Sequence, residues 1–205
     1  MINNQSRKTN IIASIVSNIF NPGILAILIL LVAVFKSNMT LNESIAWYMA
    51  ILILNGLIPG LIYLFFTQKG YVFDDTLHNR EVHKERIVIF GVFLAVATIE
   101  LLILVMLGNL YQPLYATLVG GIVAIIVAGG VSYFWKVSMH SSIVTFFVLM
   151  IILIFGFNWW PVAFIIPLTW WSRLVLYRHT IWQLIVGMSL SLMIALGTFW
   201  FFGLL

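Results

Sequence analysis

Long apolar runs, separated by short polar or Pro- and Gly-containing breaks, are the feature that most constrains how this chain can fold. Several are long enough to cross a hydrocarbon core of about 30 Å. Because no period-2 alternation is present, and spanning segments must satisfy their backbone groups internally, the runs are predicted to be helices. The sequence therefore predicts an all-α, polytopic membrane bundle of six or seven transmembrane helices, as one domain over residues 1–205. The expected apolar segments are about 11–35, 45–66, 87–107, 113–134, 143–157, 161–171 and 181–205.

Composition excludes several classes of protein. Hydrophobic residues make up 63% of the chain and charged residues 8%, which leaves too little polar surface for a water-soluble domain. The absence of Cys excludes disulfides, thiolate nucleophiles and Cys-ligated metals, so His is the remaining nitrogen ligand or nucleophile. The net charge of +4 suits anionic lipid headgroups, whereas nucleic acid would need an exposed basic domain. We expect membrane lipids as partners, with no nucleic acid and no obligate protein partner.

The amino-terminal segment combines a polar start with an internal break. MINNQSRKTN is followed by an apolar run without a small-residue cleavage site, which favours a retained anchor over a signal peptide. Asn-Pro-Gly at positions 21–23 should break the helix and leave a short interfacial piece before the span. Four glycines of the fourth run should favour close helix packing; they are Gly120, Gly121, Gly129 and Gly130.

Basic residues and histidines are segregated to one face. If seven segments cross, the loops after the second, fourth and sixth segments lie on the same face as the amino terminus. That face then holds nine of the ten Lys and Arg, with Lys36 opposite, and all four histidines: His78, His83, His140 and His179. The positive-inside rule accounts for part of this bias and predicts a cytoplasmic face, but it does not account for the histidines. If the first segment does not span, the amino terminus leaves that face. The short loops suit the inner or plasma membrane of a prokaryote.

These loops carry the groups that an oxyanion site needs. Arg86, Lys136 and Arg173 can give charge-assisted hydrogen bonds to a phosphate. Two histidines from different loops can act as nucleophile and proton donor, because imidazole titrates near neutral pH. The residues alone therefore favour phosphoryl chemistry at a membrane surface.

Three segments resemble the motifs of the type 2 phosphatidic acid phosphatase superfamily. SRLVLYRHTIWQ, residues 172–183, looks like the third motif, SRxxxxxHxxxD, with Ser172, Arg173 and His179 in register. KVSMHSS, residues 136–142, resembles the second motif, PSGH, through Ser138 and His140. HKERIVIF, residues 83–90, resembles part of the first motif, KxxxxxxRP, with Arg86 at its Arg, Ile87 where Pro belongs, and Lys84 near the leading basic residue. The resemblance covers roughly residues 80–187.

The resemblance implies a function and a role for each residue. It implies hydrolysis of a lipid phosphate or polyprenyl (di)phosphate through a phosphohistidine, without metal or cofactor. His179 would be the nucleophile and His140 the general acid. The phosphate would be held by Arg86, Arg173 and Ser138, with Ser172 and Lys84 as further substrate-binding residues.

Gln183 is where the third motif departs from the family, whose Asp at this position orients and stabilises the nucleophilic imidazole. Gln183 keeps the spacing of one helical turn and offers a carbonyl acceptor, but it carries no charge. Two outcomes follow: a slower hydrolase, or a non-catalytic member that binds or moves an anionic lipid. A His-based metal or ion transporter is a third alternative.

Other readings of the same residues remain open. Ser138 and His140 can simply cap a helix, and Arg173 and His179 can belong to a turn that reaches lipid headgroups. Lys136 and Arg178 suit topology or headgroup contacts better than phosphate binding. His78, His83, Asp74 and Asp75 are expected to be a solvated loop, not a metal site. Glu100 lies roughly 20 Å along a helix from Arg86 and is left as a packing or relay residue without an identified partner.

Overall fold

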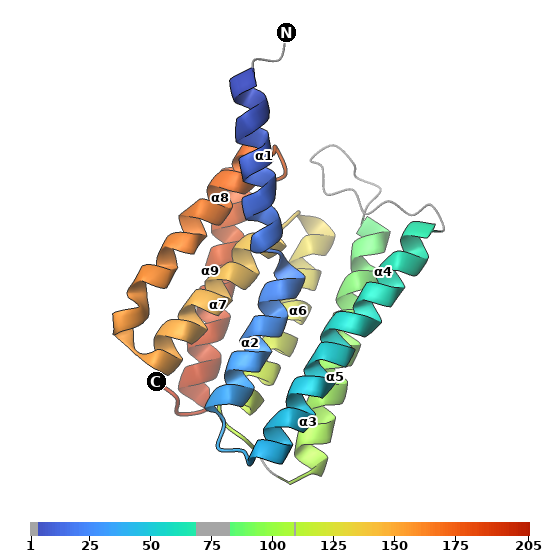
Figure 1. The fold of residues 1–205 in the computed structure, drawn as a ribbon, viewed down its shortest axis with the longest axis vertical. Helices are drawn as coiled ribbons and strands as arrows, with labels where there is room; N and C mark the ends of the chain where they lie inside the picture. The colour runs from blue at the N-terminus through green and yellow to red at the C-terminus, as the bar shows by residue number, and fades with distance from the viewer. Residues whose placement is uncertain (1–3, 69–82, 109) are drawn as a thin grey trace.

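The computed structural model describes residues 4–68, 83–108 and 110–205, and these residues form helices and short connections without any strand (Figure 1). This confirms the all-α prediction. In chain order the elements are α1 (Asn4–Ile19), α2 (Pro22–Lys36), α3 (Leu41–Ile51), the π-helix η1 (Leu52–Leu57), α4 (Ile58–Gln68), α5 (His83–Met106), α6 (Leu114–Phe134), α7 (Met139–Phe155), the 3-10 helix η3 (Phe157–Phe164), α8 (Ile165–Val175) and α9 (Ile181–Phe201).

The predicted break in the first segment is present between α1 and α2. Asn21 caps α2 by accepting a hydrogen bond from the Gly23 N–H at 2.8 Å, and Pro22 occupies the first turn, where its missing N–H costs no helical bond. The piece before the break is longer than expected: α1 has 16 residues and is not a short interfacial turn. It packs against α8, which explains why it continues as a helix.

In Figure 1, α1 and α2 run in one direction, α3 and α4 return in the other, and α5 to α9 then alternate in direction. The end of the bundle that holds the α6–α7 connection (135–138) and the α8–α9 turn (176–180), here called the upper end, also holds the last turn of α4 and the first turn of α5. The α2–α3 connection and the carboxyl terminus lie at the opposite end. Connections that are far apart in sequence therefore meet at the upper end.

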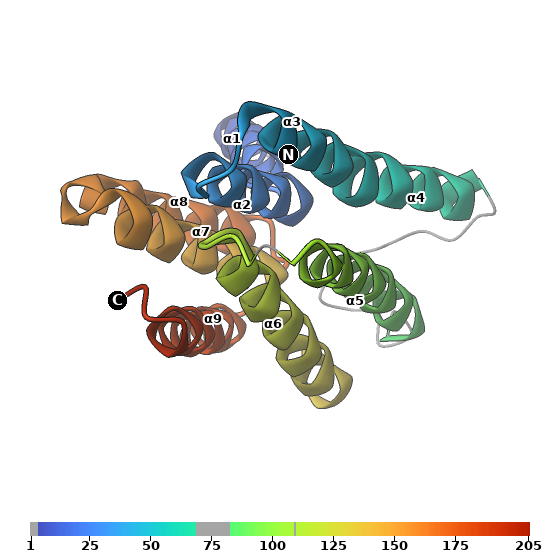
Figure 2. The same cartoon turned by 90° about the horizontal axis from the view of Figure 1, so that it is seen from below.

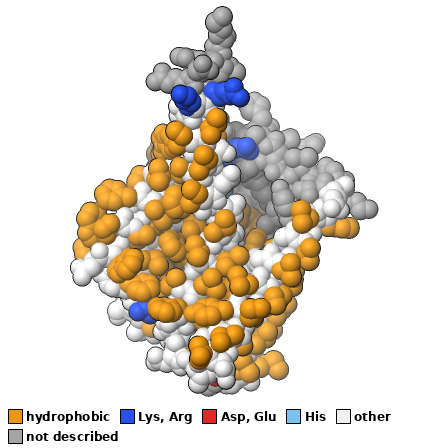
Figure 3. Space-filling model, viewed as in Figure 1, with side chains coloured by type: hydrophobic (Ala, Val, Ile, Leu, Met, Phe, Trp, Pro, Cys, Tyr) orange, Lys and Arg blue, Asp and Glu red, His pale blue; other side chains and the backbone are white. Residues whose placement is uncertain are grey.

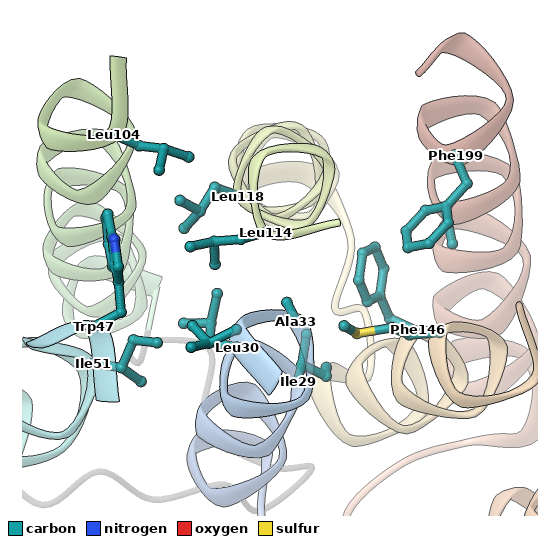
Figure 4. Close-up of a cluster of buried hydrophobic side chains, with 13 residues drawn as sticks. Ile29, Leu30, Ala33, Trp47, Ile51, Leu104, Leu114, Leu118, Phe146 and Phe199 are labelled. Atoms are coloured by element: carbon teal, nitrogen blue, oxygen red, sulfur yellow. The ribbon is translucent and has the colours of Figure 1, made fainter. Parts of the chain in front are cut away.

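The interior is filled by apolar side chains from several helices. Seen along the bundle, α2, α6, α7 and α9 lie together, with α3, α4 and α5 to one side and α8 beside α7 (Figure 2). Figure 4 shows side chains of α2, α3, α5, α6, α7 and α9 meeting in one cluster, among them Ile29, Leu30, Trp47, Leu104, Leu114, Leu118, Phe146 and Phe199.

Close packing depends on one glycine of the four in α6. A Cβ at Gly120 would lie 3.3 Å from both Phe146 and Thr198, so this glycine brings α6 against α7 and α9. Gly129 faces Phe90 at an ordinary 3.7 Å, while a Cβ at Gly121 or Gly130 would meet nothing within 4 Å. The expectation that all four glycines allow close approach is therefore right only at Gly120.

The outer surface suits a bilayer. Within the described part of the chain, four helical stretches are long and apolar enough to cross a membrane: Arg7–Lys36, Leu41–Ile62, Leu114–Phe134 and Ile181–Phe201. Figure 3 shows hydrophobic side chains over most of the visible face, with Lys and Arg side chains mainly at the upper end. At the other end, Lys36 places its Nζ 4.4 Å from the ring centroid of Phe155.

Candidate functional site

Arg173 and His179 lie on either side of one chain reversal, the α8–α9 turn. The Arg178 N–H donates to the Arg173 carbonyl at 3.0 Å and the Tyr177 N–H donates to the Leu174 carbonyl at 3.1 Å, which is the pattern of a Schellman ending. Tyr177 has φ 53°, the left-handed conformation that this ending requires. Arg173 therefore sits in the last turn of α8, and His179 follows directly after the reversal.

His179 is held by Gln183 at the start of α9. His179 Nδ1 lies 3.2 Å from Gln183 Oε1, and both side chains are buried. The same oxygen accepts a hydrogen bond from the Thr180 N–H at 3.1 Å, so it is the carbonyl end of the amide that faces the ring. A carbonyl acceptor places the imidazole proton on Nδ1 and leaves Nε2 as the basic nitrogen.

Gln183 also completes a capping box. Thr180 Oγ1 accepts a hydrogen bond from the Gln183 N–H at 3.4 Å, and Gln183 Oε1 accepts one from the Thr180 N–H at 3.1 Å. The pattern Thr-x-x-Gln before an apolar run is the sequence mark of a capping box, so this role of Gln183 was predictable but was not predicted. One side chain thus starts α9 and orients His179.

Ser17 connects Arg173 with His140. Arg173 is buried, with 4% of its surface exposed, and its Nη1 donates to Ser17 Oγ at 2.8 Å. The same Ser17 oxygen lies 3.5 Å from His140 Nε2. Sequence reasoning missed Ser17, because its role follows from the packing of α1 on α8 and no local pattern marks it.

A row of serines attaches the start of α7 to the start of α9. Three hydrogen bonds run between the two segments: Ser138 N–H to the Gln183 carbonyl at 3.3 Å, Ser141 Oγ to the Leu184 carbonyl at 2.7 Å, and Ser142 Oγ to the Gly187 carbonyl at 3.1 Å. Trp170 of α8 adds a bond from Nε1 to Ser141 Oγ at 2.8 Å. These bonds hold the first turn of α7, which bears His140, against the helix that orients His179.

Gly187 makes this attachment possible, so Gly187→Ala is expected to destabilise the protein. A Cβ at this position would lie 2.8 Å from the Ser138 carbonyl oxygen and 3.0 Å from Ser142 Oγ, which forces α7 and α9 apart. We expect a loss of about 1–3 kcal/mol, the usual range for overpacking, measured by unfolding in detergent. Gly197→Ala is the matched control on the same helix, because its Cβ would meet nothing within 4 Å. Equal stability of the two variants would contradict the attachment.

The remaining predicted residues fall into two groups. The Ser138 hydroxyl accepts from the Ser141 N–H at 3.4 Å and caps α7, as the capping alternative proposed. The Ser172 hydroxyl is fully buried and donates to the Thr169 carbonyl at 2.7 Å, within its own helix. The backbones of Lys84 and Arg86 lie in the first turn of α5, at the upper end, but their side chains are outside the described part of the structure.

The expected loop of acids and histidines is only partly covered. Asp74, Asp75 and His78 lie outside the described residues. Among the side chains that the structure describes within residues 4–68, 83–108 and 110–205, no group of three or more His, Cys, Asp or Glu is placed to hold a metal ion. Lys136 and Arg178 are both half-buried at the upper end.

Comparison with protein-family models, with curated proteins and with solved structures finds no match for this chain. The chemistry of the candidate site therefore follows from its own residues. The Ser17 hydroxyl contacts both the buried Arg173 guanidinium and the His140 imidazole. A second imidazole, that of His179, is held by the amide oxygen of Gln183. This set of groups can bind an oxyanion, supply a nitrogen nucleophile and transfer a proton.

Proposed function

We propose that this chain is a membrane-embedded phosphatase, similar to the type 2 phosphatidic acid phosphatases, that hydrolyses a lipid phosphate or a polyprenyl (di)phosphate. The observation that carries the proposal is the buried Arg173–Ser17–His140 contact beside the turn that presents His179 on Gln183. A buried arginine suits a site whose ligand is an anion, because the planar guanidinium can donate two hydrogen bonds to one phosphate.

The proposed reaction has two steps. His179 Nε2 attacks phosphorus while the bond from phosphorus to the lipid oxygen breaks, and His140 gives its proton to the leaving lipid oxygen. Water then attacks the phosphohistidine, His140 takes a proton from that water, and the phosphorus–nitrogen bond breaks to release phosphate. Arg173 stabilises the charge on the equatorial oxygens in both steps. Gln183 keeps the His179 ring oriented throughout.

The proposed enzyme has the membrane architecture that the resemblance to the type 2 phosphatidic acid phosphatases implies. The chain would cross the membrane six or seven times, with a phosphatase-like core over about residues 80–187. Arg86 and Lys84 would reach the phosphate from the first turn of α5, and the phosphate would replace Ser17 as the acceptor of Arg173. The upper end would face the cytoplasm, in agreement with its Lys and Arg residues, and the carboxyl terminus would lie on the other side.

Purified protein assayed with a panel of lipid phosphates tests the function. Phosphatidic acid, a lysolipid phosphate, a polyprenyl monophosphate and a polyprenyl diphosphate, each in mixed micelles with chelator present, should include at least one that releases inorganic phosphate. If protein with a cooperative unfolding transition releases phosphate from none of these substrates, the proposed phosphatase activity is rejected.

A second candidate function is a protein that binds or moves an anionic lipid without hydrolysing it. The amide of Gln183 favours it, because a neutral group gives an imidazolium no charge stabilisation. Tight binding of a lipid phosphate without phosphate release would support this candidate over the enzyme.

Gln183→Glu separates a weakened enzyme from a site rebuilt around an amide. Glutamate has the same length, is equally suited to the third position of the capping box, and adds a negative charge that a helix amino terminus favours. Aspartate is one methylene shorter and would strain the contact with Thr180. We expect Gln183→Glu to raise kcat by about tenfold, since a charge next to His179 stabilises the developing imidazolium. Gln183→Leu, which removes the acceptor, should lower kcat, and an unchanged rate in Gln183→Leu would contradict the orienting role. An unchanged or lower rate in Gln183→Glu would mean that the site is built around an amide.

A further inference from the structure

An apolar cavity of about 180 Å³ lies inside the bundle, between α2, α5, α6 and α7, which surround the same region in Figure 2. Its walls are mainly apolar and include Phe93 and Ala97 of α5 and Ile125 of α6. Along α6 the lining extends from Thr117 to Ser132, roughly 20 Å at 1.5 Å per residue. The space therefore suits a chain-like ligand aligned with the helices.

The two ends of the cavity differ in chemistry. Near the upper end its lining includes Val137, Met139 and Ser142, which lie within three residues of His140 at the start of α7. Deeper in the bundle the lining includes Glu100 of α5 and Asn55 of η1. A ligand in this cavity would have a polar partner at depth, far from the candidate phosphate site.

Glu100 is buried and keeps one oxygen available to a ligand. None of its surface is exposed, and its Oε1 accepts a hydrogen bond from Asn55 Nδ2 at 2.6 Å. Oε2 is buried without a hydrogen-bond partner among the described residues. Asn55 belongs to the π-helix η1, a distortion that is frequent at functional sites. Intramembrane carboxylates are rare and are usually tied to a ligand or an ion.

We propose that this cavity binds a long-chain or isoprenoid alcohol, with its chain along the apolar walls and its hydroxyl donating to Glu100 Oε2. The apolar lining disfavours an ionic headgroup, whereas a single buried acceptor matches a single donor. A metal cation would need several more oxygen ligands than Glu100 and Asn55 provide. The Thr117 hydroxyl, which also lines the cavity, donates to the Pro113 carbonyl at 2.9 Å. This site goes beyond the proposed phosphatase and does not depend on hydrolysis.

Photo-crosslinking of the 205-residue chain in lipid nanodiscs tests the site. The probes are a diazirine-labelled long-chain alcohol and the same chain capped as its methyl ether, which accepts but cannot donate a hydrogen bond. We expect the alcohol to bind about tenfold more tightly than the ether, with crosslinks on α5 and α6, since one hydrogen bond to a buried carboxyl group has this effect. Equal binding of the two probes, or crosslinks confined to other helices, would overturn the proposal.

Three variants locate the hydrogen bond and the chain. Glu100→Leu should bind alcohol and ether equally, while Glu100→Gln, which keeps an acceptor oxygen, should retain part of the preference. Gly121→Leu should weaken both probes alike, because Gly121 lines the cavity and a Cβ there meets nothing within 4 Å. A preference that survives Glu100→Leu would overturn the assignment, as would a requirement for sodium or calcium in alcohol binding. If Glu100→Leu does not fold, the comparison of the two probes on the unaltered protein and on Gly121→Leu still decides.

Discussion

Replacing His179 by alanine is expected to abolish lipid phosphate hydrolysis, with a loss of about a thousandfold or more in kcat. The proposed reaction forms a covalent bond to His179 Nε2, and His179 is the one imidazole of the turn 176–180. The position tolerates the change structurally better than most buried sites, because Thr180 and Gln183 can still form the capping box.

A covalent intermediate makes this prediction sharper than a rate alone. Brief incubation with labelled substrate should give a phosphoprotein that is stable in base and labile in acid, as expected of a phosphoramidate. His179→Ala should give none. His140→Ala should still become labelled from a substrate with a good leaving group, because that step then needs no proton donor. Hydrolysis or labelling that survives in His179→Ala would reject His179 as the nucleophile.

Loss of the Arg173 guanidinium is expected to have the second largest effect. Arg173→Gln should lower kcat/KM by about a hundredfold to a thousandfold, the usual cost of removing a donor aimed at a developing oxyanion. Arg173→Lys should recover only part of this loss, because an ammonium group cannot make the planar two-point contact of a guanidinium. Steady-state kinetics and inhibition by vanadate measure the effect on turnover and on oxyanion binding separately.

Arg178 provides the matched control for Arg173. It belongs to the same turn and carries the same charge, but its side chain is half-buried, whereas that of Arg173 is buried against Ser17. Arg178→Gln should change kcat/KM by less than about threefold, in the range of an exposed charge. Equal losses in Arg173→Gln and Arg178→Gln would mean that the positive charge of the turn acts generally and that Arg173 does not contact phosphate.

The helices were largely predictable because their signals are local. Asn-Pro-Gly separates α1 from α2, residues 135–138 separate α6 from α7, and hydropathy gives the remaining boundaries to within a few residues. The contact of His179 with Gln183 also followed from spacing along one segment. The capping box at Thr180 was equally local, and its pattern was legible in the sequence.

The contacts that complete the candidate site were not predictable, because they join distant segments. Ser17 and Arg173 are 156 positions apart, and Ser17 and His140 are 123 positions apart. The serine bonds between α7 and α9 depend on the rotation of two packed helices, which hydropathy does not specify. The π-helix at Asn55 is likewise invisible in a hydropathy pattern, although it aims the amide at Glu100.

Because Ser17 contacts the candidate site, a fragment that contains the whole candidate site must include α1. A fragment that starts near residue 80 would contain His140, Arg173, His179 and Gln183 and would match every motif of the resemblance. It would lack the hydroxyl that two of those side chains share, and the helix that covers them. The amino-terminal helix is therefore a wall of the candidate site, and a truncation that removes this helix would open the candidate site.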